Sequence, residues 1–210
     1  MRKSILFLAG FFIIILSAQA QITKGSILLG GGFSFSTANS IFPNTPDSKL
    51  TQFTISPSVG LAVKDNSVVG IFFIYSHARD NDNLQNNKFY EAGAYWRKYL
   101  PLGKSFYFFT NTQLTYLYGE WKYTTIDNLQ LLKQSTINIG IYPGVTYALN
   151  KKFHLEASLP NLINLGYTHT ENFSSGTTGQ TSYKQNSVAL YTNLSASNPF
   201  NFGFRFVIGK

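Results

Sequence analysis

Cysteine is absent from this 210-residue sequence. Its absence excludes a disulfide framework, a thiolate metal site and a cysteine nucleophile. The fold must therefore be held together by backbone pairing and side-chain packing.

Charged residues are also scarce, at 12% of the chain, where about 25% is usual for soluble domains. Aromatic residues are abundant instead, at 16%, with 13 tyrosines and 19 phenylalanines. A water-exposed surface normally carries more charge than this chain offers. The balance suits a protein whose outer surface faces lipid, with aromatic side chains at the two interfaces.

Long apolar runs are missing except near the start, from Ile5 to Leu16. Two basic residues precede this run and Ala18-Gln19-Ala20 follows it, as in a secretory signal peptide. The run is shorter than the ~20 residues of a membrane-spanning helix. We therefore expect residues 1–20 to be a signal peptide cleaved after Ala20, and residues 21–210 to form one domain. Any membrane insertion of that domain must use strands.

The rest of the chain alternates apolar and polar residues with the period of two that is typical of β-strands. Eight strands are predicted, joined alternately by short and long connections, as in outer-membrane barrels with short periplasmic turns and long extracellular loops. The predicted strands span 24–36, 50–64, 67–79, 88–100, 105–120, 135–149, 153–168 and 187–208. The predicted long loops span 37–49, 80–87, 121–134 and 169–186.

The parity of each strand predicts which side chains share a face. Outward positions are expected at Ile137, Ile139, Ile141, Leu155, Phe202 and Phe204, and inward positions at Asn138, Gly140, Ser158, Asn201 and Gly203. The third strand is apolar on both faces, so Phe72 or Ile74 is expected to fill interior volume.

Two barrels fit this alternation: a membrane barrel, and a soluble lipocalin-like barrel with an apolar interior. The polar faces carry mostly Gly, Ser, Thr, Asn and Gln, whereas a water-exposed face would be rich in Lys and Glu. Small uncharged groups can pack inside the narrow interior of eight strands. The sequence therefore favours an all-β, eight-stranded antiparallel transmembrane up-and-down β-barrel.

Three segments resemble a known family. They are the glycine-rich stretch from Gly25 to Phe35, the hairpin from Ile141 to Leu159, and the terminal strand ending at Ile208. Together they resemble the outer-membrane β-barrel domain family of Gram-negative bacteria, which comprises small single-domain porin-like barrels. The resemblance implies an outer-membrane location and this fold, but it specifies no activity, because one fold hosts many functions.

The last strand is also similar to the insertion signal that the barrel-assembly machinery reads. The matching positions are Asn201, Gly203, Phe206 and Ile208, although the chain continues to Lys210 instead of stopping at a terminal aromatic. The alternative interpretation is an amphipathic strand with a glycine that relieves a bend.

Catalytic and cofactor signals are thin. None of the three histidines, His77, His154 and His169, has the His-X-Ser spacing of barrel deacylases, and no histidine pair has metal-ligand spacing. No cofactor and no metal are expected, and an enzyme is not expected.

A few charges share the interior parity: Arg97, Glu156 and Arg205. Each lies about four or five residues from a periplasmic turn or terminus, so the three are expected at similar height. Glu91 lies roughly 20 Å farther along its strand and is expected to be excluded. A buried charge is costly unless paired, so the sequence predicts a Glu156–Arg205 ion pair that Arg97 joins, plugging the interior.

The sequence thus predicts an outer-membrane barrel with a plugged narrow lumen and a structural or surface-interaction role. A small-solute pore or transporter is the main alternative, and a lipid-modifying enzyme the third. Expected partners are membrane lipids, lipopolysaccharide and the barrel-assembly machinery, and nucleic acid is not expected despite the pI of 9.6. The sequence leaves the partner of the surface loops open.

Overall fold

A computed structural model describes residues 22–40, 48–80, 85–124, 128–159, 162–176, 179–192 and 201–209. Within these ranges the chain forms one antiparallel sheet of twelve strands. No helix in the described part is long and apolar enough to cross a membrane. The expected signal peptide, residues 1–20, lies outside the described residues and stays a prediction.

The strands follow one another along the chain without helices between them in the described ranges. Their bounds are β1 Ile27–Gly31, β2 Phe33–Ser40, β3 Ser48–Ile55, β4 Ser58–Lys64, β5 Ser67–Asp80, β6 Gln85–Pro101, β7 Phe106–Thr124, β8 Asn128–Ala148, β9 Phe153–Ser158, β10 Ile163–Gly176, β11 Gly179–Tyr191 and β12 Asn201–Ile208.

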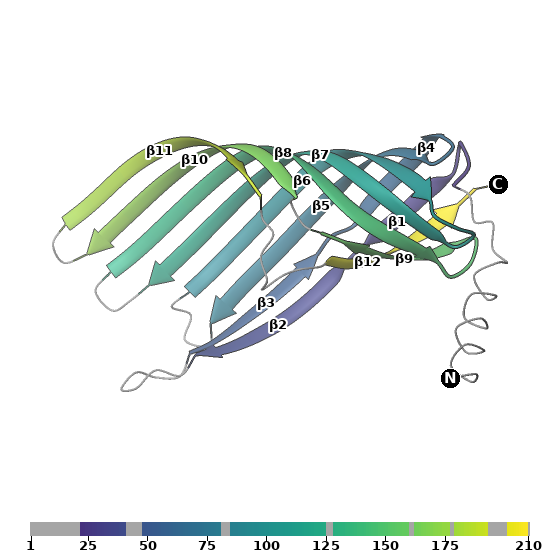
Figure 1. Ribbon diagram of the computed structural model, residues 1–210. Coiled ribbons are helices and arrows are strands. Elements are labelled where there is room, and N and C mark those ends of the chain that lie inside the picture. The colour runs from purple at the N-terminus through teal and green to yellow at the C-terminus, as the bar shows by residue number, and fades with distance from the viewer. Residues whose placement is uncertain are drawn as a thin grey trace, which may run out of the picture.

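Backbone pairing closes a ring through eight of these strands (Figure 1). The ring runs β4-β1-β12-β9-β8-β7-β6-β5, and β5 pairs with β4 again. β12 takes part in the closure, because Phe206 on β12 pairs both with Leu29 on β1 and with Phe153 on β9. The ring makes every strand in it paired on both sides, which removes free strand edges at this level.

The other four strands extend the sheet beyond one end of the ring (Figure 1). β3 pairs with the second half of β5, and β2 pairs with β3. β10 pairs with the first two thirds of β8, and β11 pairs with β10. We call this end the hairpin end, and the opposite end, which carries the short connections, the turn end.

The predicted number of eight strands is wrong, because four predicted strands are each divided in two. β1 and β2 are separated at Gly32, and β3 and β4 at Ser56-Pro57. Proline has no N–H to donate to a ladder. Beside it, the N–H of Gly32 bonds to the hydroxyl of Ser56 at 2.9 Å as well as to the backbone oxygen of Ser56 at 3.3 Å. A side chain at position 32 would collide with that hydroxyl, at 2.9 Å from the added Cβ.

The same division affects the two other long predicted strands. The predicted strand 153–168 becomes β9 and β10, and the predicted strand 187–208 becomes β11 and β12. β9 and β10 both pair with β8, but the other neighbour of β9 is β12 and that of β10 is β11. β11 pairs with β10, whereas β12 pairs with β9 and β1. Apolar alternation alone does not reveal where a chain changes partner.

Two predicted long loops are also wrong. β7 and β8 leave only residues 125–127 between them, and β10 and β11 leave only 177–178, so most of 121–134 and 169–186 is strand. The physical reason is exposure: every residue of β11 is exposed. A strand with water on both faces has no reason to alternate, so its polar sequence resembles that of a loop.

The short connections are where the sequence predicts them. Asp65-Asn66 joins β4 to β5, and Asn66 adopts a positive φ of 56°, which asparagine tolerates better than most residues. Asn150 closes the turn before β9, because its side-chain oxygen accepts the N–H groups of Lys152 and Phe153, each at 2.8 Å.

The predicted sidedness of the strands is confirmed. Ile139 and Leu155 are 48% and 44% exposed on the outer face, and Phe202 is 79% exposed. The remaining outward set, Ile137, Ile141 and Phe204, is exposed as well. The predicted inward residues Asn138 and Gly140 are buried, whereas Ser158 and Gly203 are partly buried. The side chain of Asn201 lies outside what the structure describes.

The interior near the turn end is apolar. Ile22, Leu28, Val68, Tyr107 and Phe109 are all buried there and form one cluster with their neighbours. Phe72 packs against this cluster, and Phe72 and Ile74 both line the interior cavity described below, as the sequence predicts for the third strand. The charged residues of the interior lie next to this apolar cluster.

Candidate functional site

Three charged residues meet inside the ring, each from a different strand. Arg97 lies on β6, Glu156 on β9 and Arg205 on β12. The Oε1 atom of Glu156 is 2.6 Å from Nη1 of Arg97 and 2.8 Å from Nε of Arg205. The structure thus brings together the three residues that the sequence assigns to one interior cluster. We call them the charge cluster.

Neutral side chains complete the hydrogen bonding of the charge cluster. Tyr99 and Thr146 donate to the same Glu156 oxygen at 3.3 and 3.4 Å. Arg97 donates from Nε to the side-chain oxygen of Asn111 at 3.3 Å. Charge-assisted hydrogen bonds of this kind are stronger than neutral ones, so the carboxylate is fixed from several directions.

Arg205 makes the corresponding contacts on the other side of the carboxylate. Its Nη1 donates to the hydroxyls of Ser58 at 3.4 Å and Tyr95 at 3.3 Å. Ring faces add to this, because the guanidinium carbon of Arg97 lies 4.1 Å from the centre of the Phe109 ring. A guanidinium over an aromatic face is attracted by the ring electrons.

The charge cluster is deeply buried. Arg97 is 5% and Arg205 7% exposed, and the side chain of Glu156 is 9% exposed. Burial of an ion is costly unless it is paired. Two guanidinium groups face one carboxylate, so the charge cluster retains one positive charge in excess.

His154 lies on the side of the charge cluster toward the turn end. It is 1% exposed and its ring stacks on that of Tyr107, with the centroids 6.4 Å apart. Neither ring nitrogen has a hydrogen-bond partner among the described residues. Its surroundings are those of a packed histidine rather than of a base aligned on a nucleophile.

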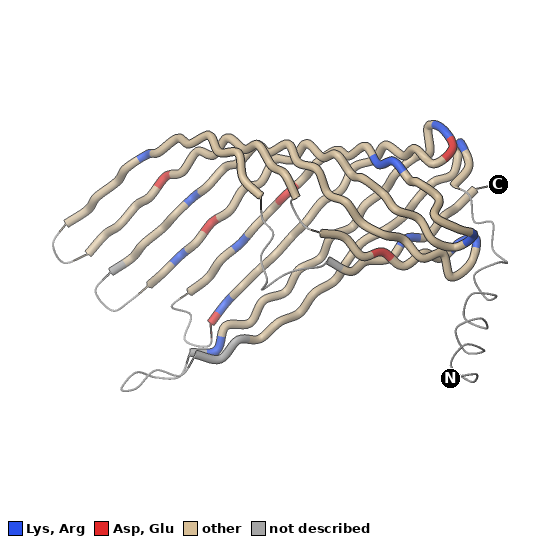
Figure 2. The backbone as a smooth tube through the Cα atoms, in the orientation of Figure 1, with Lys and Arg blue, Asp and Glu red and all other residues tan. Residues whose placement is uncertain are grey.

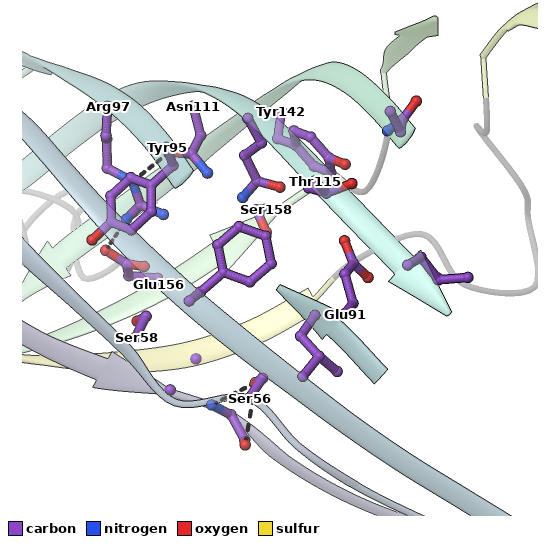
Figure 3. Close-up of a pocket in the computed structure, with 18 of the residues that line it drawn as sticks. Ser56, Ser58, Glu91, Tyr95, Arg97, Asn111, Thr115, Tyr142, Glu156 and Ser158 are labelled. Atoms are coloured by element: carbon purple, nitrogen blue, oxygen red, sulfur yellow. Dashed lines mark hydrogen bonds and ion pairs between the residues drawn. The ribbon is translucent and has the colours of Figure 1, made fainter. Parts of the chain in front are cut away.

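A cavity of about 640 Å³ adjoins the charge cluster (Figure 3). Arg97, Glu156 and Arg205 line one side of it. Glu91 lines the cavity too, and Figure 3 shows it on the opposite side from Arg97 and Glu156. Among the described residues Glu91 makes no ion pair with either arginine, as the sequence predicts from its position on β6.

The chain was compared with known protein families, curated proteins and solved structures. A scan against models of known protein families finds no match, and a comparison with curated proteins finds none either. Among solved structures, the chain is similar to the ferric yersiniabactin uptake receptor FyuA of Yersinia pestis, with 11% sequence identity and a TM-score of 0.42. The match covers 80% of this chain. It spans only 31% of the receptor, and it supports no transfer of function.

The residues of the candidate assembly signal lie on β12. Phe206 and Ile208 are exposed on the outer face, at 47% and 52%, and Gly203 is partly buried on the other face. Asn201 pairs through its backbone with Ser158. Their place on a ring-closing strand is a structural fact, and their role in assembly stays a prediction.

The described residues contain no group of three or more His, Asp or Glu side chains placed to hold a metal ion. Two of the histidines bond to asparagine: His77 to Asn86 at 3.1 Å, and His169 to Asn186 at 2.6 Å.

Sequence reasoning missed a row of charges on the outer face near the hairpin end. Directly paired residues on five neighbouring strands alternate in sign: Lys88, Glu120, Lys133, Glu171 and Lys184. Figure 2 shows the alternating colours crossing the strands. We call these five residues the charge row. Opposite charges on directly paired positions stabilise a sheet.

The far end of the charge row is closely paired. Nζ of Lys184 lies 2.5 Å from Oε1 of Glu171. The hydrogen bond from Lys184 holds the pKa of the exposed Glu171 carboxyl below its ordinary value. The sequence did not indicate this row, because Lys133, Glu171 and Lys184 fall in segments predicted as loops and because the register between strands cannot be read from alternation.

Proposed function

We propose that this chain is an integral outer-membrane protein whose eight-stranded ring is a closed transmembrane barrel with a structural or surface-interaction role. The observation that carries the proposal is the outer face. Apolar side chains cover it around the ring, including Ile71, Leu114, Ile139 and Phe202, each exposed by 48% or more. Soluble monomers rarely expose a continuous apolar surface of this extent.

The dimensions of the apolar band support a membrane span. A transmembrane strand needs about 9–11 residues, and on β8 the outward apolar positions run from Ile137 to Tyr147. A lipid-facing band of this kind accounts for a surface that water would not favour.

The borders of the band carry the residues that membrane interfaces prefer. Toward the hairpin end, Tyr75, Tyr90 and Tyr118 pair directly with one another on the outer face. The charge row follows two residues farther along the same strands, beginning with Lys88. Toward the turn end, Trp96 is 51% exposed. Aromatic girdles at both interfaces are typical of outer-membrane barrels.

The interior supports a closed barrel over an open pore. The apolar cluster with Leu28 and Val68 and the charge cluster both occupy the lumen toward the turn end. A narrow barrel of eight strands is readily filled by side chains. We therefore propose that solutes do not pass, and that a pore or transporter is the alternative to be tested.

Partners and activity follow from the same surfaces and remain proposals. Membrane lipids and lipopolysaccharide would contact the outer face, and the barrel-assembly machinery would read β12. Basic residues beside the short connections, such as Lys64, Lys104 and Lys151, would meet anionic head groups.

We propose a non-enzymatic role. When the protein is incubated with labelled lipopolysaccharide, we expect the acyl chains of the lipopolysaccharide to stay unchanged.

Cell fractionation and electrophoresis test the location. The mature chain should sediment with outer membranes and migrate differently before and after boiling, because a closed barrel resists detergent until heated. Recovery in the soluble periplasm would contradict the proposal.

Planar-bilayer recording tests the closed interior. The inserted protein should show no steady single-channel conductance. Regular conductance steps would favour the pore. They would not contradict the proposed location in the outer membrane.

A further inference from the structure

The charge cluster is not neutral by itself. Arg97 and Arg205 supply two positive charges and Glu156 one negative charge, all within hydrogen-bond distance. Glu91 is across the cavity and pairs with neither arginine among the described residues. An unpaired buried charge attracts a counterion. This local excess favours a negatively charged ligand group beside the two arginines, while the Glu91 carboxylate across the cavity brings the sum over the charged lining residues to zero.

The arginines also keep donors free for such a ligand. Their hydrogen bonds to described residues use Nε and Nη1. A guanidinium carries five N–H groups, so the two N–H groups of each Nη2 have no partner among the described residues. Both side chains line the cavity. Each Nη2 can therefore donate single charge-assisted hydrogen bonds, one from each arginine, to a carboxylate that lies beside both.

The cavity walls offer neutral hydrogen-bonding groups and ring faces. Asn138 is the clearest case: it is only 8% exposed, it lines the cavity, and its Oδ1 atom has no partner among the described residues. Gln113, Thr115, Ser158 and Thr168 line the cavity as well. Such side chains both donate and accept, as hydroxyl groups of a ligand do.

Ring faces complete the walls. Phe72, Tyr95 and Tyr142 line the cavity, and aromatic faces pack against the C–H groups of a sugar ring. Its volume of about 640 Å³ lies within the range of small-molecule sites, about 300–1,000 Å³.

We propose that this cavity binds a small hydroxylated carboxylate, of the class of the sugar acids. Its carboxylate would lie against Arg97 and Arg205, and its hydroxyl groups would bond to Asn138, Gln113 and Glu91. A phosphate ester would bring two negative charges into a cavity that already holds the carboxylates of Glu156 and Glu91. The inference goes beyond the proposed structural role, because binding requires only the interior geometry and neither conductance nor catalysis.

Calorimetric titration of the mature protein folded in detergent micelles tests this with three probes. D-glucuronate supplies both the carboxylate and the hydroxyl groups, D-glucose only the hydroxyl groups, and cyclohexanecarboxylate only the carboxylate. We expect glucuronate to bind, and each of the other two to bind at least about tenfold more weakly. Equal binding of glucose, equal binding of cyclohexanecarboxylate, or no binding of glucuronate would overturn the proposal.

Substitutions that supply an internal carboxylate test the role of the charge excess. Asn111→Asp is nearly isosteric and adds a negative charge beside Nε of Arg97, now 3.3 Å from the Asn111 oxygen. It should weaken glucuronate binding at least about tenfold, because the excess positive charge is then offset within the protein. Gln180→Glu makes the same charge change on the exposed strand β11 and should leave binding unchanged. Unaltered binding in Asn111→Asp would refute the site.

Ser58→Asp is a second variant, since Ser58 contacts the other arginine at 3.4 Å, and it should weaken binding in the same way. If neither variant folds, the unsubstituted protein still decides the matter. Chloride should compete with glucuronate, so the dissociation constant should rise with sodium chloride concentration at fixed pH. A constant value would contradict an arginine-based anion site.

Discussion

At the scale of single residues, Glu156 has an outsized role because one of its oxygens serves four donors. Arg97, Arg205, Tyr99 and Thr146 all approach Oε1 within 3.4 Å. Its charge holds two buried guanidinium groups that would otherwise repel each other. Removing one member of a buried ion network costs more than the network contributes, because the remaining charges stay buried.

Glu156→Gln should therefore lower the free energy of unfolding by about 3–5 kcal/mol, the usual cost of breaking a buried pair. Urea titration of the protein folded in lipid vesicles measures this. Glu91→Gln is the matched control, because Glu91 lines the same cavity without an arginine partner, and it should cost less than about 1 kcal/mol. Equal losses in the two variants would contradict the role of Glu156. The same preparation can be recorded for conductance, which should appear in Glu156→Gln if the charge cluster is the plug.

Part of this site could be read from the sequence. Parity and distance from the turns select Arg97, Glu156 and Arg205, because few charged residues have interior parity. The neutral members could not be selected in this way. Tyr95, Tyr99 and Asn111 look like many other polar residues of the same parity, and only the register between strands brings them to the charge cluster.

At the scale of the element, β8 has two environments along its length. From Ile137 to Tyr147 its outward residues are apolar and exposed. Nearer its start, Lys133 pairs with Glu120 on β7 and Glu171 on β10. If the apolar part of β8 lies in hydrocarbon and its start lies in water, substitution by arginine should lower the free energy of unfolding by very different amounts at the two places.

Ile139→Arg should destabilise the folded protein in a bilayer by about 2–4 kcal/mol, the cost of an arginine near the midplane on the lipid face. Leu131→Arg changes the same strand and the same face eight residues nearer its start, beside the polar hairpin end. It should cost less than about 1 kcal/mol. Unfolding from lipid vesicles gives both values. Similar small costs at both positions would mean that Ile139 does not contact hydrocarbon.

Strand positions and faces followed from alternation wherever one face is apolar, as in β8 and β9. The same principle failed where both faces meet water, which is why residues 179–186 of β11 were expected to be a loop. It also missed the interruption at Pro57, on either side of which β3 and β4 pair with β5 in the same register, because alternation does not show where a ladder loses an N–H donor.

At the scale of the whole molecule, the features are ordered along one axis. Basic residues lie at the turn end (Figure 2). The apolar cluster, the charge cluster, the cavity and the polar hairpins follow it. On the outside, Trp96, the apolar band, the tyrosines and the charge row follow in the same direction. The interior features and the outer-face features change along the axis in the same direction. This is expected if one end of a barrel faces the periplasm and the other the cell exterior.

The central claim is that the outer face of the ring contacts lipid, and tryptophan fluorescence in brominated vesicles tests it most directly. The chain has two tryptophans, of which Trp96 lies on the outer face and Trp121 packs against Phe89. In a Trp121→Phe variant, the emission of Trp96 should be strongly quenched by brominated acyl chains, and in a Trp96→Phe variant that of Trp121 should be quenched much less. Absence of quenching at Trp96, with the protein folded, would contradict the account.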